Sequence, residues 1–232
     1  MIKYPLTCID NFFDDPQSIS KFAESLKYTP DPLNRWPGCR SETLYSINQD
    51  LFNYVCIKYL RAHHSQEEQK NLFYKADARF QIVNTEYTEG WIHTDYPIVH
   101  TMITYLSPSV DLDSGTSIYE LKDGAKTIDK SVVDIKKEYY RKVKENEKFT
   151  KKEEEHFANI QKLNNDLFYE TASFKNVFNR CIGFDGYMWH GAGKFKTNLK
   201  KDRLTLIIFF HEISSDVTGI QRCYSTPHTN FF

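Results

Sequence analysis

The sequence predicts a mainly β protein with flanking helices, and three observations support this fold class. From residue 78 onward the chain consists of short β-branched and aromatic segments separated by Gly, Pro and Asp, as in a sandwich or barrel. Aromatic residues make up 15% of the chain, and such side chains favour strands. The 232 residues suffice for a single domain with a substantial core, which we expect to span 1–232.

Residues 1–77 are expected to contain an N-terminal strand and two helices. Loosely alternating apolar residues predict the strand within the first ten residues. Pro16 suits a first helical position after two aspartates that can cap a helix, and apolar residues then recur at helical spacing until near Tyr28. A second helix is predicted over 47–63, where apolar residues occupy one face.

Six further strands are predicted in a core formed by 78–120 and 171–213. Each is short, apolar or alternating, and bounded by turn residues. They cover 78–84, 90–95, 99–106, 116–121, 176–184 and 203–213.

The stretch 121–170 differs in composition and is predicted to be a helical, charged insertion. It carries 12 Lys/Arg and 11 Asp/Glu in 50 residues, about 46% charged, against about 21% in the rest of the chain. Because the two signs alternate, we interpret it as a solvated, salt-bridged excursion. A lid or a partner-binding arm is the alternative.

Composition also excludes several classes of protein. The net charge of −1 provides no basic surface for nucleic acid or anionic membranes, and no run of 18 apolar residues could span a bilayer. The N-terminus lacks the pattern of a signal peptide. The cysteines are odd in number and scattered, at positions 8, 39, 56, 181 and 223. We therefore expect reduced thiols and a cytoplasmic protein, in the host cytoplasm if the source is viral.

The first chemical signal is His93-Thr94-Asp95. Residues two apart on a strand point to the same face, so His93 and Asp95 can meet one ion. Alone the pattern is weak, because 8 His and 31 acidic residues produce about one such pair by chance.

Later residues strengthen this signal. His190 ends an apolar segment before a Gly-rich corner, and Arg203 opens the most apolar strand, with Thr205 on the same face. A buried guanidinium needs an anionic partner. Two His and one carboxylate are the facial ligand set of non-haem Fe(II) oxygenases.

With these residues the chain resembles the Fe(II)/2-oxoglutarate-dependent oxygenases, nearest to prolyl 4-hydroxylase-like and phage-encoded members. The resemblance rests on motifs that follow in the family's order between residues 78 and 213. They are YTEGWIHTD, ITYLSP, SGTSIYE, FNRCIGFDGYMWHGAG and RLTLIIFF. The N-terminal segments around DNFFDDPQ and RWPGCRSETL also resemble phage-type relatives. Ser114, where the family often has Gly, and the charged insertion depart from the pattern.

The resemblance implies a double-stranded β-helix (jelly-roll) core and a role for each matching residue. His93, Asp95 and His190 would bind Fe(II), and Arg203 would bind 2-oxoglutarate through its distal carboxylate. Further contacts to 2-oxoglutarate would come from Thr205 and Tyr105, and more weakly from Gln81. The reaction would be hydroxylation by O2, coupled to decarboxylation of 2-oxoglutarate to succinate and CO2.

The substrate is the least specified part. The resemblance suggests a prolyl residue in a peptide or protein, or a free amino acid or other small molecule, whereas a nucleic-acid substrate lacks a basic groove. Trp91, Tyr119 and Trp189 flank the expected pocket and are weak candidates for substrate contact. The segment from Arg35 to Arg40 is either a closing loop or a plain turn.

Each residue also has a structural alternative. His93 suits a core histidine, Asp95 a turn before Pro97, and His190 a cap of the Gly-rich corner. Arg203 could instead pair with Asp185 or Glu212. The aromatic, Thr and Gln candidates could be ordinary strand residues.

For the whole chain, a non-catalytic jelly-roll module that binds a metal or a small molecule is the alternative function. A zinc hydrolase is disfavoured, because no Glu base lies beside the histidines in a helix.

Overall fold

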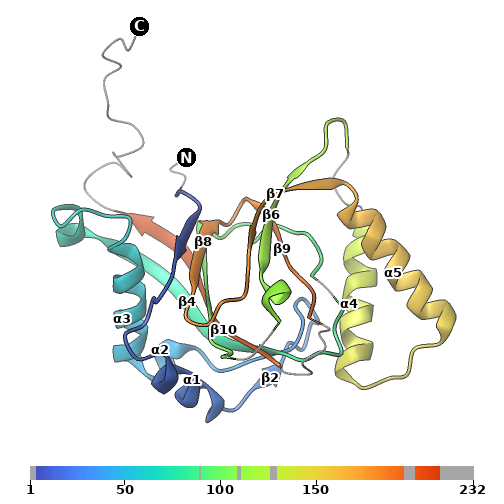
Figure 1. The fold of residues 1–232 in the computed structure, drawn as a ribbon, viewed down its shortest axis with the longest axis horizontal. Coiled ribbons are helices and arrows are strands. Elements are labelled where there is room, and N and C mark those ends of the chain that lie inside the picture. Colours follow the sequence, from blue (N-terminus) through green and yellow to red (C-terminus); the bar gives the residue numbers. More distant parts are fainter. Residues whose placement is uncertain (1–3, 89, 109–110, 126–129, 196–201, 215–232) are drawn as a thin grey trace, which may run out of the picture.

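The protein folds around two antiparallel β-sheets that face each other (Figure 1). The computed structural model describes residues 4–88, 90–108, 111–125, 130–195 and 202–214. The large sheet has the strand order β1-β8-β5-β10-β4-β3-β2, and the small sheet has the order β7-β6-β9. Two such sheets with helices outside them form the mainly β, jelly-roll architecture that the sequence predicts.

The elements have the following bounds. The large sheet contains β1 (Thr7–Ile9), β2 (Thr29–Pro30), β3 (Cys39–Arg40), β4 (Phe73–Val83), β5 (His100–Tyr105), β8 (Cys181–Asp185) and β10 (Arg203–Ser214). The small sheet contains β6 (Thr116–Leu121), β7 (Phe168–Phe174) and β9 (Trp189–Ala192). The α-helices are α1 (Pro16–Glu24), α2 (Leu44–Ile47), α3 (Gln49–Leu60), α4 (Lys130–Lys144) and α5 (Lys151–Asn165), and 3₁₀ turns cover Glu68–Asn71 and Leu112–Ser114.

The large sheet has a hydrophobic core on each face. Leu206 and Ile208 of β10 are fully buried in the cluster that also contains Val55 and Tyr59 of α3. Ile207 belongs to the cluster between the two sheets. This alternation follows from the two-residue period of a strand. The helices α1 to α3 therefore cover one face of the large sheet, and the other face looks toward the small sheet (Figure 1).

The N-terminal strand and helices form as predicted, with shorter helices. Pro16 opens α1, and the Asp15 carboxylate accepts a hydrogen bond from the backbone N–H of Ser18. This helix ends at Glu24 rather than near Tyr28, whose hydroxyl donates to the Ala23 carbonyl oxygen. No helix in the described part of the chain is long and apolar enough to cross a membrane.

The strand predictions are correct for five of the six segments, with shifted ends. The sixth, 90–95, is wrong, because this segment contacts β9 through one isolated bridge instead of a ladder. In the segment 176–184, β8 begins only at Cys181. The strands β2, β3, β7 and β9 were not predicted. β7 begins inside the stretch assigned to the insertion, and the four-residue β9 contains Gly191, so it shows little alternation.

The insertion is helical, but it is not a solvated excursion. Its outer charges pair as expected, with Arg141 contacting Glu138, Glu145 and Glu147. Its inner face packs against the body of the protein. Tyr139, Tyr140 and Val143 of α4 and Phe157 of α5 are buried with Val83, Tyr87, Trp91 and Phe195. Apolar residues at helical spacing thus fix α4 and α5 to the body of the protein, beside the small sheet (Figure 1).

Acid is expected to destabilise the fold through His100, which is fully buried on β5 and lies 2.5 Å from the Tyr59 hydroxyl at its Nε2 atom. Burial, helped by nearby His63, lowers the pKa of His100 to about 3. Because the folded-state pKa lies below the unfolded value, stability is complete well above pH 6.5 and falls by about 1.4 kcal/mol per pH unit between pH 6.5 and about 3. Urea unfolding of His100→Gln, which keeps a hydrogen-bond acceptor, should show a shallower loss between pH 6.5 and 5.

The exposed His156 on α5 provides the control, since His156→Gln should keep the wild-type pH dependence. An equally steep loss in His100→Gln and wild type would contradict the assignment.

Candidate metal centre

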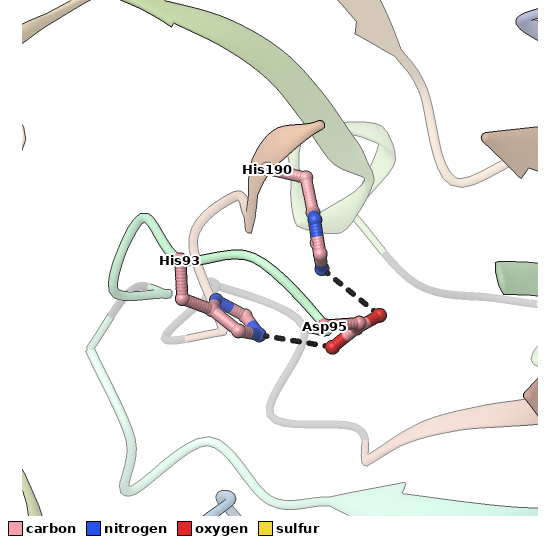
Figure 2. A group of neighbouring side chains, drawn as sticks. All are labelled: His93, Asp95 and His190. Atoms are coloured by element: carbon pink, nitrogen blue, oxygen red, sulfur yellow. Dashed lines mark ion pairs between the residues drawn. The ribbon is translucent and has the colours of Figure 1, made fainter. Parts of the chain in front are cut away.

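Three potential metal ligands meet between the segment 90–98 and β9. The ligand atoms of His93, Asp95 and His190 all lie within 4.8 Å of one another. The Asp95 carboxylate lies beside both rings, with its oxygens 3.6 Å from His93 Nε2 and 3.4 Å from His190 Nε2 (Figure 2). The described part of the chain contains no second group of this kind.

The backbone holds the two histidines opposite each other. His93 and His190 form an isolated antiparallel bridge with two hydrogen bonds of 2.9 Å, one in each direction. The Asp95 N–H donates to the Gly186 carbonyl oxygen at 2.8 Å. Paired residues point to the same side, so the bridge places the rings together, with their centroids 4.5 Å apart.

Neighbouring groups orient all three side chains. The Nδ1 atoms of His93 and His190 lie 2.8 and 2.9 Å from the carbonyl oxygens of Trp91 and Met188. A carbonyl oxygen only accepts, so Nδ1 carries the proton in each ring and Nε2 keeps a free lone pair. The Thr101 hydroxyl donates to Asp95 Oδ2 at 2.7 Å. Such outer contacts orient ligands in metal sites.

The local electrostatics suit a cation. The His93 side chain is 43% exposed at the mouth of the site, yet desolvation by the surrounding protein, with His190 and Lys136 nearby, lowers its pKa to about 3. Burial opposes ionisation of Asp95, but His190 and His93 outweigh it, and the pKa of this carboxyl falls well below its usual range. A neutral imidazole and an ionised carboxylate are the forms that bind metals.

A second polar group lies deeper between the sheets. Arg203 is buried, with its guanidinium 5.3 Å from the Tyr105 ring and 5.6 Å from the Phe195 ring. One of its terminal nitrogens donates a long 3.4 Å hydrogen bond to the Thr116 hydroxyl. No carboxylate of the described residues forms an ion pair with it, and its Nε has no hydrogen-bond partner there.

The residues around Arg203 include two of the predicted ligand contacts. Tyr105 and Thr205 face each other on β5 and β10, and the Tyr105 hydroxyl donates to Thr116 at 2.9 Å. The Thr205 hydroxyl is buried without a partner. A guanidinium nitrogen and a hydroxyl that are buried together without hydrogen-bond partners destabilise the fold, unless an anion accepts their hydrogen bonds. These buried polar atoms therefore suit a ligand carboxylate, which Arg binds as a fork.

The structure also tests the purely structural roles that sequence analysis offered for the candidate residues, and the outcome differs between residues. Asp185 accepts from the Tyr187 N–H and forms no ion pair with Arg203, and neither does Glu212. The Asp95 carbonyl oxygen accepts from the Ile98 N–H, so Asp95 opens a turn and also faces the histidines. Gln81 lies in register with Thr205, but its amide is bonded to Arg40 and to the Pro37 carbonyl oxygen.

The weak substrate candidates lie farther from the three ligands. Trp91 is buried against α4 and lines a cavity of about 930 Å³ between α4, α5 and the segment 86–91. Tyr119 and Trp189 pair with each other across β6 and β9, on the opposite side of the small sheet from His190. The structure does not bring these two side chains to the metal site. In the segment Arg35–Arg40, the last two residues form β3 beside β4.

Sequence analysis did not identify two residues that support the candidate site. Thr116 lies within the SGTSIYE motif, and the strand period puts it on the same face as Ile118, the partner of His190. That spacing could have identified it. The contact of Thr101 with Asp95 depends on the turn between them, which no short pattern encodes.

Comparison with protein families identifies the family of this chain. A family model matches residues 2–210, and its description is a family of unknown function (DUF6445). The chain belongs to this family. No curated protein matches it significantly.

Solved structures are similar in fold at low sequence identity. HygX from Streptomyces hygroscopicus, with nickel and 2-oxoglutarate bound, is 10% identical, with 88% of this chain and 82% of HygX covered and a TM-score of 0.53. EvdO2 from Micromonospora carbonacea var. aurantiaca, complexed with 2-oxoglutarate, is 10% identical, with 95% and 92% covered and a TM-score of 0.51. A Trichoplax adhaerens prolyl hydroxylase in complex with a peptide fragment is 9% identical, with 88% and 82% covered and a TM-score of 0.50. These likenesses establish the double-stranded β-helix fold of this DUF6445 member.

The Thr101–Asp95 contact leads to a test of the metal site. Thr101→Val keeps the shape of a buried β5 residue and removes the hydrogen bond to Asp95. Loss of such an outer contact typically weakens metal binding about 10- to 100-fold. Equilibrium dialysis with Fe(II) under anaerobic conditions measures the change.

Thr104→Val is the matched control, because Thr104 is equally buried on β5 but faces the opposite side of the sheet. Equal iron affinity in Thr101→Val and Thr104→Val would show that the hydroxyl does not support the ligand set.

Proposed function

We propose that this protein is an Fe(II)- and 2-oxoglutarate-dependent dioxygenase that hydroxylates an organic substrate. The observation that carries the proposal is the pairing of two sites in one interior: the His93, Asp95 and His190 cluster, and the buried Arg203 without a counter-ion. The first suits a divalent metal with open positions. The second suits the far carboxylate of a dicarboxylic oxo-acid. The oxygenase fold of HygX and EvdO2, crystallised with 2-oxoglutarate, supports the proposal.

The chain's own residues would perform distinct tasks. His93 Nε2, His190 Nε2 and one Asp95 oxygen would hold Fe(II), leaving positions for the oxo-acid and O2. Arg203, with Thr205 and the Tyr105–Thr116 pair, would orient 2-oxoglutarate. Iron supplies the activation of O2 that couples decarboxylation to substrate oxidation. The buried apolar residues around Arg203 exclude water from the oxo-acid.

The substrate belongs to the same proposal. A small molecule, or a prolyl or other residue of a peptide, is consistent with the motif resemblance. Among similar structures, HygX has been crystallised with hygromycin B, and the Trichoplax enzyme with a peptide fragment. Reconstitution with Fe(II) and 2-oxoglutarate in air tests the activity, and succinate should form. Metal binding without succinate formation or 2-oxoglutarate binding would favour a non-catalytic module.

Arg203 provides a prediction that separates ligand binding from folding. A buried guanidinium without an anion destabilises the ligand-free fold, so Arg203→Met should unfold at the same or a higher urea concentration than wild type. Its affinity for 2-oxoglutarate should fall about 30-fold or more, because a buried charge-assisted fork is lost. Calorimetric titration of the metal-loaded protein measures this affinity.

Arg180→Met is the control, since Arg180 pairs with Asp10 outside the core and should not affect 2-oxoglutarate. If Arg203→Met unfolds early and retains its 2-oxoglutarate affinity, Arg203 is a structural residue.

A further inference from the structure

Two cations flank the candidate metal site without a counter-ion of their own. Arg40 extends from β3, and Lys136 extends from α4. Neither forms an ion pair with a carboxylate in the described ranges. Both interact electrostatically with Asp95, which already lies against His93, His190 and Thr101.

The sheet register places Arg40 on the face that looks toward the metal site. Arg40 pairs with Gln81, and Gln81 pairs with Thr205, so all three share one side of the large sheet. The Arg40 guanidinium lies 4.1 Å from the Trp36 ring and 5.3 Å from the Phe209 ring. Phe209 pairs with Thr101, the residue that bonds Asp95. The Arg40 Nε donates to Gln81, and no described group accepts from its two terminal nitrogens.

Lys136 reaches the same place from the insertion. Burial of Tyr140 and Val143 fixes α4 against Trp91, two residues before His93. Lys136 Nζ lies 5.8 Å from the Tyr140 ring and interacts with both His93 and Asp95. At the other end of α4, Lys144 Nζ donates to Asn34 Oδ1 at 3.1 Å, which joins this helix to the segment that leads into Arg40. The helix that carries Lys136 thus contacts the segment that precedes Arg40.

The other carboxylates that attract Arg40, Asp77 and Asp31, each form an ion pair with another arginine. Asp77 pairs with Arg79 at 2.9 Å, and Asp31 pairs with Arg35 at 3.0 Å. In the loaded site, a divalent metal, the Asp95 carboxylate, the 2-oxoglutarate dianion and Arg203 would cancel one another. Arg40 and Lys136 would then remain as two positive charges in a partly desolvated opening, where their attraction for an anion is stronger than in water.

We propose that Arg40 and Lys136 form a substrate-recognition site, and that the substrate carries an anionic group, a carboxylate or a phosphate, beside the bond that is oxidised. This inference rests on the proposed dioxygenase function and specifies its substrate class. Arg40 offers two free donors in a plane, and Lys136 offers a mobile point charge. The charged insertion would then contribute one wall of the substrate opening.

Anion binding to the loaded protein tests this site without knowledge of the substrate. The protein is loaded with Ni(II) and 2-oxoglutarate, and inorganic phosphate and acetate are titrated separately by calorimetry at low ionic strength. One of the two should bind to wild type, and the tighter one identifies the anionic group. Arg40→Gln and Lys136→Gln should each weaken its binding at least tenfold and leave the affinity for 2-oxoglutarate unchanged.

Matched controls are Arg35→Gln, whose cation is paired with Asp31, and Lys137→Gln, on the adjacent α4 position near Asp134. Both should bind the anion as wild type does. Anion binding that persists in Arg40→Gln and Lys136→Gln would lie on the metal and would overturn the inference, as would no binding to wild type. A loss of 2-oxoglutarate affinity in Arg40→Gln would assign Arg40 to the cosubstrate instead. If Arg40→Gln does not fold, Lys136→Gln decides alone.

If the protein is not a dioxygenase, the same titrations give a different result. Protein that takes up Ni(II) but no 2-oxoglutarate would contradict the dioxygenase proposal, and the substrate inference would fall with it. Protein that takes up both and binds neither anion would contradict the substrate inference alone.

Discussion

The candidate site depends on the isolated backbone bridge between His93 and His190. This bridge joins the segment 90–98, which precedes β5 of the large sheet, to β9 of the small sheet. No other residue of that segment lies in a ladder. Its two hydrogen bonds align both imidazoles, and the Asp95 carboxylate, just before a turn, faces the Nε2 atoms of both rings. Close packing enforces this approach. A Cβ atom at Gly90 would lie 2.5 Å from the Ala192 backbone nitrogen. Only glycine therefore allows these two backbone segments to come so close.

Sequence patterns predicted the helices and most strands, because α1, α3 and β10 bury their apolar residues at regular spacing. They failed at 90–95, where an alternating segment forms a single bridge, since pairing depends on the partner strand rather than on local alternation. The candidate ligand triad and Arg203 were predicted from residue type and order. The supporting contact from Thr101 depends on a turn that no local pattern encodes, whereas the strand period could have identified Thr116.

The charged insertion shows how composition can mislead. Its alternating charges predicted a solvated, salt-bridged excursion, and its outer side carries such salt bridges. Yet Tyr139, Tyr140 and Val143 recur at helical spacing within the charged stretch and bury one face of α4. The charged fraction of the whole stretch averages over both faces of α4, whereas the helical spacing of its apolar residues distinguishes the two faces. The same helix carries Lys136 toward the metal ligands, which no pattern of charge along the chain distinguishes from its exposed neighbour Lys137.

The central claim is that one interior holds both a metal and a dicarboxylic oxo-acid, and that the metal completes the oxo-acid site. Anaerobic calorimetric titration of 2-oxoglutarate into the protein, with and without Fe(II), tests this claim most directly. The account predicts one 2-oxoglutarate per iron, and binding that is much weaker in the metal-free protein. Stoichiometric iron binding at the His93, Asp95 and His190 cluster with no uptake of 2-oxoglutarate would contradict it.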